Sequence, residues 1–264
     1  MDLLIKDKSF LVVGGTGGIG LAAAKVLAAE GASVAVVGRH AGRADAAAAE
    51  VAAAGASTKA HALVFDVSAE GSAAAAVAAA VELFGGLDGV AVTTGLIGHE
   101  PIEISDDRWI EVFRDVMLGT TRTVEAALPH LVASKGTIVT TAAYSIRAPE
   151  IARLPYASMK SAVATFTKGI AKAYGQKGVR ANCVAPGAIE TSALTAIRKQ
   201  VSEAKGIPYE QALERVMIED WGLDIALDRP GKPEEVGALI AFLLSPVAGY
   251  MTGALLNIDG GTNF

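Results

Sequence analysis

Tyr156 and Lys160 are the two residues of this sequence whose types and spacing best fit proton transfer. They are four positions apart in a helix-like segment, so they would share one face of a helix. A free phenol has a pKa of about 10 and is a poor acid at neutral pH, but a nearby ammonium group lowers that value. The pair could therefore protonate the oxygen of a carbonyl that accepts a hydride. Because such pairs also arise by chance, this interpretation requires a cofactor site elsewhere in the chain.

A glycine-rich loop near the start of the chain has the features of such a site. In FLVVGGTGGIG, Gly14, Gly18 and Gly20 lie between a strand-like apolar run and an alanine-rich, helix-like segment. Glycines here allow a tight turn, let backbone amides approach a pyrophosphate, and present the amino end of a helix to its charge. A glycine-rich turn that binds no ligand is the alternative. However, the predicted strand before the loop, the helix after it and the next strand follow the order of a dinucleotide-binding site.

Short apolar runs alternate with longer alanine-rich segments along most of the chain. The runs predict strands at residues 10–13, 33–37, 62–65, 89–94, 136–141, 179–184 and 254–258. Helices are expected near 17–30, 41–54, 69–84, 106–133, 155–174 and 233–245. Apolar strands separated by helices are buried on both faces. We therefore expect an α/β fold of Rossmann type: a doubly wound, mostly parallel, seven-stranded sheet flanked by helices on both faces, with residues 1–264 as one domain.

Residues 192–228 break this alternation. The segment is mixed and polar, contains Trp221, and follows the carboxyl end of a predicted strand. Open sheets bind their ligands at that edge. We interpret the segment as a lid over a substrate pocket, and an ordinary surface excursion is the alternative.

Composition and charge exclude several classes of protein. Apolar residues make up 52% of the chain and the mean hydropathy is +0.40, yet the most apolar stretch, SAAAAVAAAVELF, is too short to span a bilayer. The first residues lack the features of a signal peptide. A net charge of -5 argues against a nucleic-acid surface. We therefore expect a cytoplasmic protein that acts on small molecules, with no membrane or nucleic-acid partner.

Cysteine and histidine give no sign of a metal site. Cys183 is the single cysteine, which excludes an internal disulfide, and it fits a buried position in a strand. The four histidines, His40, His61, His99 and His130, are scattered without the spacing of metal ligands. His99 follows a predicted strand, where it could contact a substrate or simply lie at the surface.

Several further motifs occur in a fixed order along nearly the whole chain. They are FDVS at residue 65, YASMK at 156, VRANCVAPGAIET at 179, RPGKPEEV at 229 and MTGALLNIDGG at 251. Together with the glycine loop they resemble the short-chain dehydrogenase/reductase family, in particular members similar to 3-oxoacyl reductases. The resemblance implies an oxidoreductase that interconverts a ketone and a secondary alcohol with a nicotinamide cofactor. It also implies a homotetramer, with a homodimer as the alternative.

The resemblance implies a role in cofactor binding for individual residues. Asp66 would contact the adenine amino group, although it could instead cap a helix, and Lys160 would bind the nicotinamide ribose. The remaining cofactor residues that it implies are Gly14, Thr16, Gly18, Ile19, Gly20, Arg39, Val67, Gly95, Tyr156, Pro186, Gly187, Ile189 and Thr191.

The residues after the second predicted strand favour NADP(H). A site for NAD(H) would carry an Asp or Glu there to bind the adenosine ribose, but the sequence reads Gly38, Arg39, His40. Arg39 could pair with the 2′-phosphate of NADP(H) and stack on adenine, with help from Arg43. NAD(H) stays possible, because Arg39 could also be a solvated surface charge.

Three positions depart from the family pattern near the reacting end. Ala143 stands where the family has its catalytic serine, and Ser145, two residues later, is the candidate replacement. Tyr144 and Thr141 are further hydroxyls nearby. Val116 stands where the family has an asparagine that holds a water, and residues 92–95 read Val-Thr-Thr-Gly rather than Asn-Asn-Ala-Gly. These departures indicate a divergent subgroup.

Two functions remain open from the sequence. The first is an NADP(H)-dependent oxidoreductase with Tyr156, Lys160 and Ser145 as catalytic residues. The second is a nucleotide-binding homologue with weakened catalysis that acts as a sensor or structural subunit. Val116 and Ala143 favour the second function, whereas the retained Tyr156 and Lys160 favour the first.

Overall fold

Seven parallel strands form a single sheet in the part of the chain that this computed structural model describes, residues 2–55, 59–95, 103–149, 153–220, 222 and 224–262. Their order is β3-β2-β1-β4-β5-β6-β7, which reverses between β1 and β4. The strands are β1 Ser9–Val13, β2 Ser33–Gly38, β3 Ala60–Val64, β4 Gly89–Val92, β5 Thr137–Thr141, β6 Arg180–Pro186 and β7 Leu255–Ile258. The reversal creates the crevice in which doubly wound sheets bind ligands.

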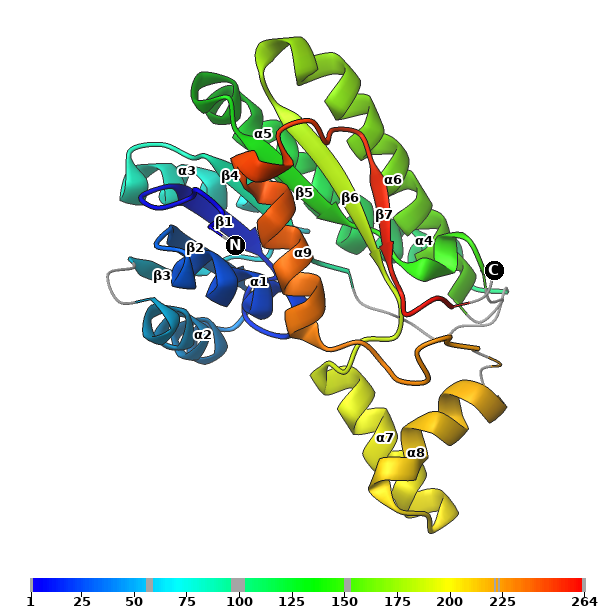
Figure 1. Ribbon diagram of the computed structural model, residues 1–264. Coiled ribbons are helices and arrows are strands. Elements are labelled where there is room, and N and C mark those ends of the chain that lie inside the picture. Colours follow the sequence, from blue (N-terminus) through cyan, green and yellow to red (C-terminus); the bar gives the residue numbers. More distant parts are fainter. Residues whose placement is uncertain are drawn as a thin grey trace.

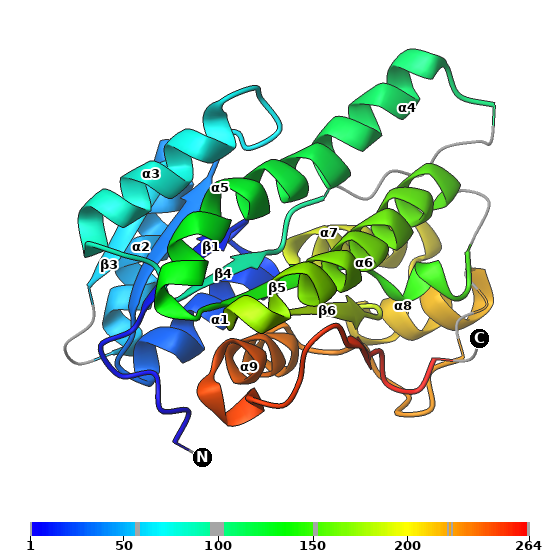
Figure 2. The same cartoon turned by 90° about the horizontal axis from the view of Figure 1, so that it is seen from above.

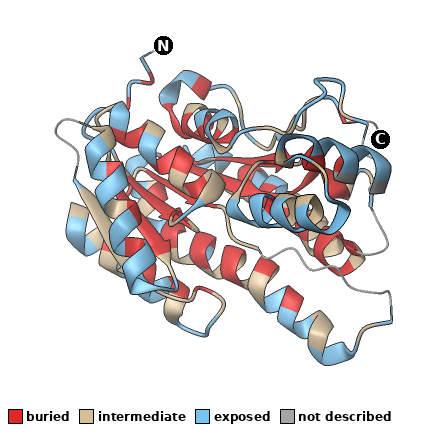
Figure 3. Ribbon diagram, turned by 90° about the horizontal axis from the view of Figure 1, so that it is seen from below, coloured by how far each residue is buried: buried red, intermediate tan, exposed pale blue. Residues whose placement is uncertain are grey.

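Helices cover both faces of the sheet, as the sequence predicted. On one face lie α1 (Gly18–Ala29), α2 (Ala41–Ala54) and α9 (Pro233–Leu244), packed on Phe10 and Val12 of β1. On the other lie α3 (Ser72–Phe84), α5 (Gly119–Ser134) and α6 (Leu154–Tyr174), packed on Leu11 and Val13. In Figure 1 α9 lies in front of the sheet, and Figure 2 shows it on the opposite side of the strands from α5 and α6. Figure 3 shows the strands as the buried layer between helices whose outer faces are exposed.

Small residues bring the layers close together. A Cβ added at Gly237 of α9 would lie 2.7 Å from backbone atoms of Ala22 and Ala23 in α1. A Cβ at Gly89 of β4 would lie 2.7 Å from the Phe10 ring. The high alanine and glycine content thus reflects close helix–helix and helix–sheet contacts rather than a membrane segment. No helix among the described residues is long and apolar enough to cross a membrane.

The helix predicted for residues 106–133 has a π-helical turn in its middle. It consists of α4 (Asp106–Val112), the π turn Phe113–Leu118, and α5, which Figure 2 shows as one long rod. Ser105 caps its start by accepting a hydrogen bond from the backbone of Arg108. The wider turn places Val116 fully in the interior. Such turns occur often at functional sites.

The segment 192–228 contains two further helices beyond the carboxyl end of β6. They are α7 (Ser192–Lys205) and α8 (Tyr209–Arg215), followed by the π turn Val216–Asp220, and Figure 1 shows them extending past the edge of the sheet. Arg198 of α7 joins the two helices by donating to the backbone oxygens of Tyr209 and Glu210, at 2.7 and 3.1 Å. Trp221 and His99, which the sequence analysis singled out, lie outside the described residues.

Candidate active site

Two adjoining cavities open at the carboxyl edge of the sheet. The larger one, of about 410 Å³, lies over β5, β6 and the start of α6, and the smaller one, of about 250 Å³, lies beside the ends of β1 and β2. Gly17, Thr93 and Gly95 line both cavities, so the two lie side by side. Together they form an elongated site at the point where the strand order reverses.

The structure brings all of the sequence-predicted site residues to these two cavities. The smaller cavity is lined by Gly14, Thr16, Arg39, Asp66, Val67 and Gly95. The larger cavity is lined by Gly18, Ile19, Gly20, Gly95, Ser145, Tyr156, Lys160, Pro186, Gly187, Ile189 and Thr191. The residues come from seven different segments of the chain, and the sheet collects them along one edge.

The glycine loop leaves no room for side chains on its inner side. A Cβ at Gly14 would lie 2.7 Å from Thr93 Oγ1, and one at Gly20 would lie 2.5 Å from the same atom. Gly14 also has a φ of +81°, which favours glycine. Thr93 Oγ1 itself donates to the backbone oxygen of Val13 at 3.0 Å. Thr93, one of the departures from the family pattern, therefore ties β4 to the loop after β1.

Two arginines and two aspartates, Asp66 and Asp115, are the charged residues that line the smaller cavity. Arg39 and Arg43 are exposed and line it together. Asp66 Oδ1 accepts hydrogen bonds from the backbone nitrogen and Oγ of Ser68, at 3.0 and 2.7 Å. This short-range turn holds the carboxylate in place. The alternative role for Asp66 as a helix cap is not what the structure shows, because α3 begins at Ser72 with Gly71 at its cap.

Tyr156 and Lys160 lie on the buried face of α6, one turn apart. Tyr156 is 8% exposed and Lys160 is 2% exposed. Lys160 Nζ donates to the backbone oxygens of Thr94 and Thr141, at 2.8 and 2.7 Å. It lies 5.6 Å from the centroid of the Tyr156 ring. The carbonyl oxygens at the ends of β4 and β5 thus fix the ammonium group beside the phenol.

Burial changes the acidity of both groups. It raises the pKa of Tyr156 above the ordinary value of 10.0, and the positive charge of Arg153 opposes this rise. It lowers the pKa of Lys160 to about 8, against the influence of Cys183 and Asp115. The expectation that Lys160 gives Tyr156 a lowered pKa is therefore corrected. Burial disfavours the phenolate more than the positive charge of Arg153 favours it.

Ser145 is buried in the wall of the larger cavity with an unused hydroxyl group. It lies in the short 3-10 turn Tyr144–Ile146, which follows β5, and is 1% exposed. Its Oγ has no hydrogen-bond partner among the described residues. Buried hydroxyls are normally paired, so this one is available to a bound molecule.

Ala143 and Val116, the two apolar departures, lie in one cluster with Tyr156. The cluster also contains Val112 and Val163. Positions at which the family has polar side chains therefore form an apolar wall against the phenol ring. The two apolar replacements thus belong to the same cluster.

Arg153 is a residue of this site that the sequence reasoning missed. It is 6% exposed, lines the larger cavity, and donates from Nη1 to the hydroxyl oxygen of Tyr144 at 3.1 Å. Its place three residues before Tyr156, one helical turn away, was the available signal. Asp115, which lines the smaller cavity from the π turn, was also missed.

The segment after β6 forms the opposite wall. A Cβ at Gly187 would lie 2.7 Å from Asp259 Cα, so only glycine fits between these strands' ends. Ile189 pairs with Gly231 in a parallel bridge. The methyl group of Thr191 lies 3.1 Å from where a Cβ of Gly18 would be. Thr191 therefore closes the larger cavity against the glycine loop.

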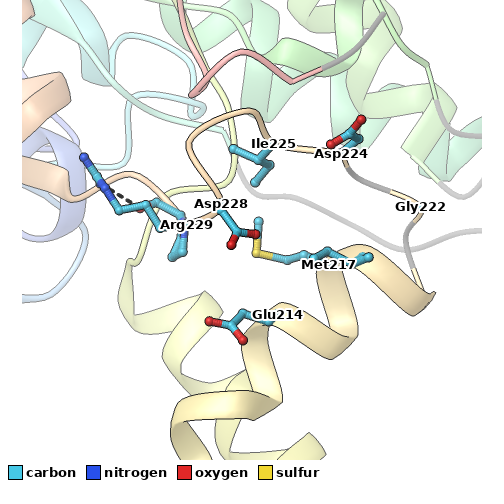
Figure 4. A pocket seen from close by; sticks show the side chains of 9 residues that line it. Glu214, Met217, Gly222, Asp224, Ile225, Asp228 and Arg229 are labelled. Atoms are coloured by element: carbon cyan, nitrogen blue, oxygen red, sulfur yellow. Dashed lines mark hydrogen bonds between the residues drawn. The ribbon is translucent and has the colours of Figure 1, made fainter.

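A third cavity, of about 290 Å³, is lined by Glu214 of α8, by Met217 of the π turn and by residues from 224 to 230. Figure 4 shows Met217 reaching from the π turn toward Asp228, with Glu214 one turn before it. On its other side Met217 belongs to the cluster that packs on Tyr144. This cavity therefore lies behind the wall of the larger one, with an apolar layer between them.

Residues 14–263, nearly the whole chain, match the family model described as enoyl-(acyl carrier protein) reductase. The chain belongs to the short-chain dehydrogenase/reductase family. Glucose 1-dehydrogenase 2 of Bacillus subtilis (strain 168) is 31% identical over 261 residues, which cover 97% of this chain and 95% of that protein. The 3-oxoacyl-[acyl-carrier-protein] reductase FabG of Chlamydia muridarum (strain MoPn / Nigg) is 29% identical over 264 residues and 99% of both chains.

A solved structure with the same architecture is L-sorbose reductase from Gluconobacter frateurii, in complex with NADPH and L-sorbose. It has a TM-score of 0.93 and 27% identity, and the match covers 99% of this chain and 98% of that one. The fold and family predicted from the sequence are thus confirmed, including the relation to 3-oxoacyl reductases. As a short-chain dehydrogenase/reductase, the protein is an enzyme that acts on a CH–OH group or a ketone with a nicotinamide cofactor.

Proposed function

We propose that this enzyme is an NADP(H)-dependent reductase that interconverts a ketone and a secondary alcohol on a small substrate. The observation that carries the proposal is the buried, unpartnered hydroxyl of Ser145 in the same cavity as Tyr156 and Lys160. That cavity shares Gly17, Thr93 and Gly95 with the adjoining glycine-loop cavity. The nicotinamide cofactor, when bound, supplies or accepts the hydride.

The residues present fit such a cofactor. Gly14 and Gly20 leave a side-chain-free cradle beside Thr93, ahead of the amino end of α1. Asp66 and Val67 would hold the adenine, and the nicotinamide half would lie against the wall of Pro186, Gly187, Ile189 and Thr191. Lys160 would bind the nicotinamide ribose.

NADP(H) is preferred over NAD(H) because of charge at the smaller cavity. Arg39 and Arg43 both line it, and neither Gly38 nor His40 supplies the carboxylate that would repel a 2′-phosphate. A guanidinium is a strong partner for phosphate. NAD(H) remains a possible second cofactor.

Tyr156 is the general acid in reduction and the general base in oxidation. Burial raises its pKa, so the phenol is a weaker acid than free tyrosine but can still donate to the developing alkoxide, which is a stronger base than a phenolate. Ser145 would donate a second hydrogen bond to the same oxygen. Arg153 and Lys160 would stabilise the phenolate that remains after the transfer.

The helices α7 and α8 act as a lid over the substrate, within a single domain. Support comes from their place beyond β6 and from Leu194, Leu213 and Met217, which pack on the cavity-wall residue Tyr144. Closing of this lid would expel water from the site.

A homotetramer or homodimer in the cytoplasm is the proposed assembly and location, without a nucleic-acid or membrane partner. Support for self-association comes from exposed apolar side chains on two regular elements, Ile110 and Phe113 on the long helical rod and Leu255 on β7. Size-exclusion chromatography with light scattering tests the assembly, and a monomer at micromolar concentration contradicts it.

The deciding experiment measures loss of NADPH absorbance with a panel of ketones, alongside NADPH binding by fluorescence. Turnover together with binding supports the proposal. Binding without turnover of any ketone supports the second function, a nucleotide-binding homologue. The specific observation that favours this second function is the apolar cluster of Val116 and Ala143 around Tyr156.

A further inference from the structure

Glu190 joins two parts of the molecule in the loop that follows β6, residues 187–191, here called the cofactor loop. Its backbone nitrogen donates to the backbone oxygen of Gly231 at 2.8 Å, and Gly231 donates in turn to the backbone oxygen of Ala188 at 2.9 Å. These two bonds fix the loop to the segment ahead of α9. The side chain of Glu190 is bound by a different element, because its Oε1 accepts a hydrogen bond of 2.7 Å from Nη1 of Arg198 in α7. Glu190 therefore links the body of the enzyme to the lid helices.

Arg198 uses all three of its side-chain nitrogens in this link. Besides Glu190, it binds the start of α8, where Nε donates to the backbone oxygen of Tyr209 and Nη2 donates to that of Glu210. Its guanidinium carbon also lies 4.2 Å from the centroid of the Tyr209 ring. The planar fork of a guanidinium group lets one side chain bind several acceptors at once. Arg198 thus holds together the cofactor loop and the two helices, which lie side by side in Figure 1.

The residues on both sides of Glu190 line the larger cavity. Ile189 precedes it and Thr191 follows it, and both belong to the proposed binding site for the nicotinamide half of the cofactor. Ser192 and Ala193, with which α7 begins, line the same cavity. The cofactor loop and the first turn of α7 are therefore one continuous piece of the cavity wall.

The lid also supports the wall from behind, on the substrate side. Leu194 of α7, Leu213 of α8 and Met217 of the π turn form an apolar layer that packs on Tyr144, which lines the larger cavity. Leu194 lies one helical turn before Arg198. A change in the angle between the cofactor loop and the lid would therefore move this layer relative to Tyr144.

The ion pair is sheltered enough to act as a stiff link. The side chain of Arg198 is 16% exposed and that of Glu190 is 35% exposed, so water screens the two charges only in part. Charge-assisted hydrogen bonds are also stronger than neutral ones. We propose that Arg198 and Glu190 are positioning residues that transmit cofactor binding to the lid. A cofactor that fixes Ile189 and Thr191 thereby also fixes α7 and α8. This inference rests on the cofactor site of the proposed function.

Hydrogen exchange of backbone amides tests the inference without any turnover. The quantity measured is the protection ratio, the exchange rate without NADPH divided by the rate with saturating NADPH, for residues 14–20 and for residues 192–215. In the wild-type enzyme we expect a protection ratio of about 5 to 50 in both regions, the range typical of coupling between two sites. In Arg198→Met, NADPH should protect residues 14–20 as before, but the ratio for residues 192–215 should fall to about 1.

Arg215→Met is the matched control. It makes the same change on an exposed arginine of α8, whose Nε lies 3.9 Å from Oε1 of Glu219, and we expect it to keep the wild-type ratios. Glu190→Gln keeps an acceptor oxygen for Arg198 and should retain part of the protection of residues 192–215. Circular dichroism and the protection of residues 14–20 verify that each variant is folded and binds NADPH.

A double-mutant cycle separates positioning from a merely structural role. Glu190→Met should remove the protection of residues 192–215 as Arg198→Met does, and the two changes together should have no further effect, because the residues act as one unit. A structural role would instead speed exchange in residues 192–215 equally with and without NADPH, which leaves the protection ratio unchanged and overturns the inference. If Arg198→Met fails to fold, Glu190→Met decides in the same way.

The failures of the two proposals are distinguishable. If NADPH protects residues 14–20 of the wild-type enzyme but not residues 192–215, the inference is overturned and the proposed function stands. The same holds if Arg198→Met or Glu190→Met keeps the wild-type protection of residues 192–215. If NADPH protects neither region of the wild-type enzyme, the proposed cofactor site fails and the inference fails with it.

Discussion

Lys160 Nζ lies 5.6 Å from the ring centroid of Tyr156, on the same buried face of α6. Its hydrogen bonds go to the backbone oxygens of Thr94 and Thr141 rather than to the phenol. The ends of two parallel strands therefore position the cation. Its effect on Tyr156 and on any bound cofactor depends on this fixed geometry.

The buried ammonium group makes stability depend on pH in a defined window. Burial lowers the pKa of Lys160 from 10.5 to about 8, so the folded protein loses this proton at lower pH than the unfolded chain. From about pH 8 to about pH 10 the unfolded chain holds more protons here, and the contribution of Lys160 to the free energy of unfolding rises with pH. Denaturant titrations should show that Lys160→Met lacks this rise. Parallel curves for wild type and variant would contradict the prediction.

Ser145 is predicted to donate a hydrogen bond to the reacting oxygen. Ser145→Ala should lower kcat by about 100- to 1000-fold, as removal of an oxyanion donor does, with NADPH affinity unchanged. Ser161→Ala on α6 is the matched control, because the Ser161 hydroxyl bonds the backbone oxygen of Ala157 and does not line the cavity. Equal rates for the Ser145 and Ser161 variants would show that another hydroxyl holds the substrate.

Gly95 must lack a side chain where the two cavities meet. Its φ is +126°, and a Cβ there would lie 3.0 Å from Lys160 Nζ, which is already bound to two carbonyls. We expect Gly95→Ala to destabilise the protein by about 1–3 kcal/mol and to weaken NADPH binding. Gly42→Ala is the control, because nothing lies near its Cβ in α2. That change should stabilise the helix by about 0.5–1 kcal/mol. Thermal unfolding and NADPH titration give both values, and two variants with the same unfolding temperature would contradict the packing argument.

Arg39 is predicted to select NADP(H). Arg39→Asp removes the partner of the 2′-phosphate and adds a repelling charge, so NADPH affinity should fall by at least about 10- to 100-fold relative to NADH affinity. The ratio of the two dissociation constants by fluorescence titration is the measurement. Lys59→Asp makes the same charge change on a residue outside the cavity and is the control. The prediction fails if the two variants change the ratio equally.

The fold and the cofactor-binding part of the site could be predicted because they depend on local sequence patterns. Phe10 to Val13 read as a buried strand, and the glycines that follow read as a turn into a helix. Asp66, Arg39 and Thr191 each follow a predicted strand, and parallel strands end at the same edge. The sheet therefore brought these residues together as expected.

The chemistry of the reacting end could not be predicted in the same way, because it depends on burial and on long-range contacts. The spacing of Arg153 from Tyr156 places it near the start of the helix, but the sequence does not reveal its hydrogen bond to the Tyr144 hydroxyl. The π turn at Val116 shares the apolar pattern of an ordinary helix, so sequence periodicity does not reveal it. The raised pKa of Tyr156 follows from desolvation, which spacing along the chain does not encode.

The most direct test of the central claim, that Tyr156 transfers the proton, is the turnover number of Tyr156→Phe for reduction of the ketone that the wild-type enzyme turns over fastest. We predict a fall in kcat of about 100- to 10,000-fold, because the variant keeps the ring and loses only the proton donor. The NADPH dissociation constant, measured in the same samples, should stay at the wild-type value. A Tyr156→Phe variant that retains wild-type kcat would contradict the claim.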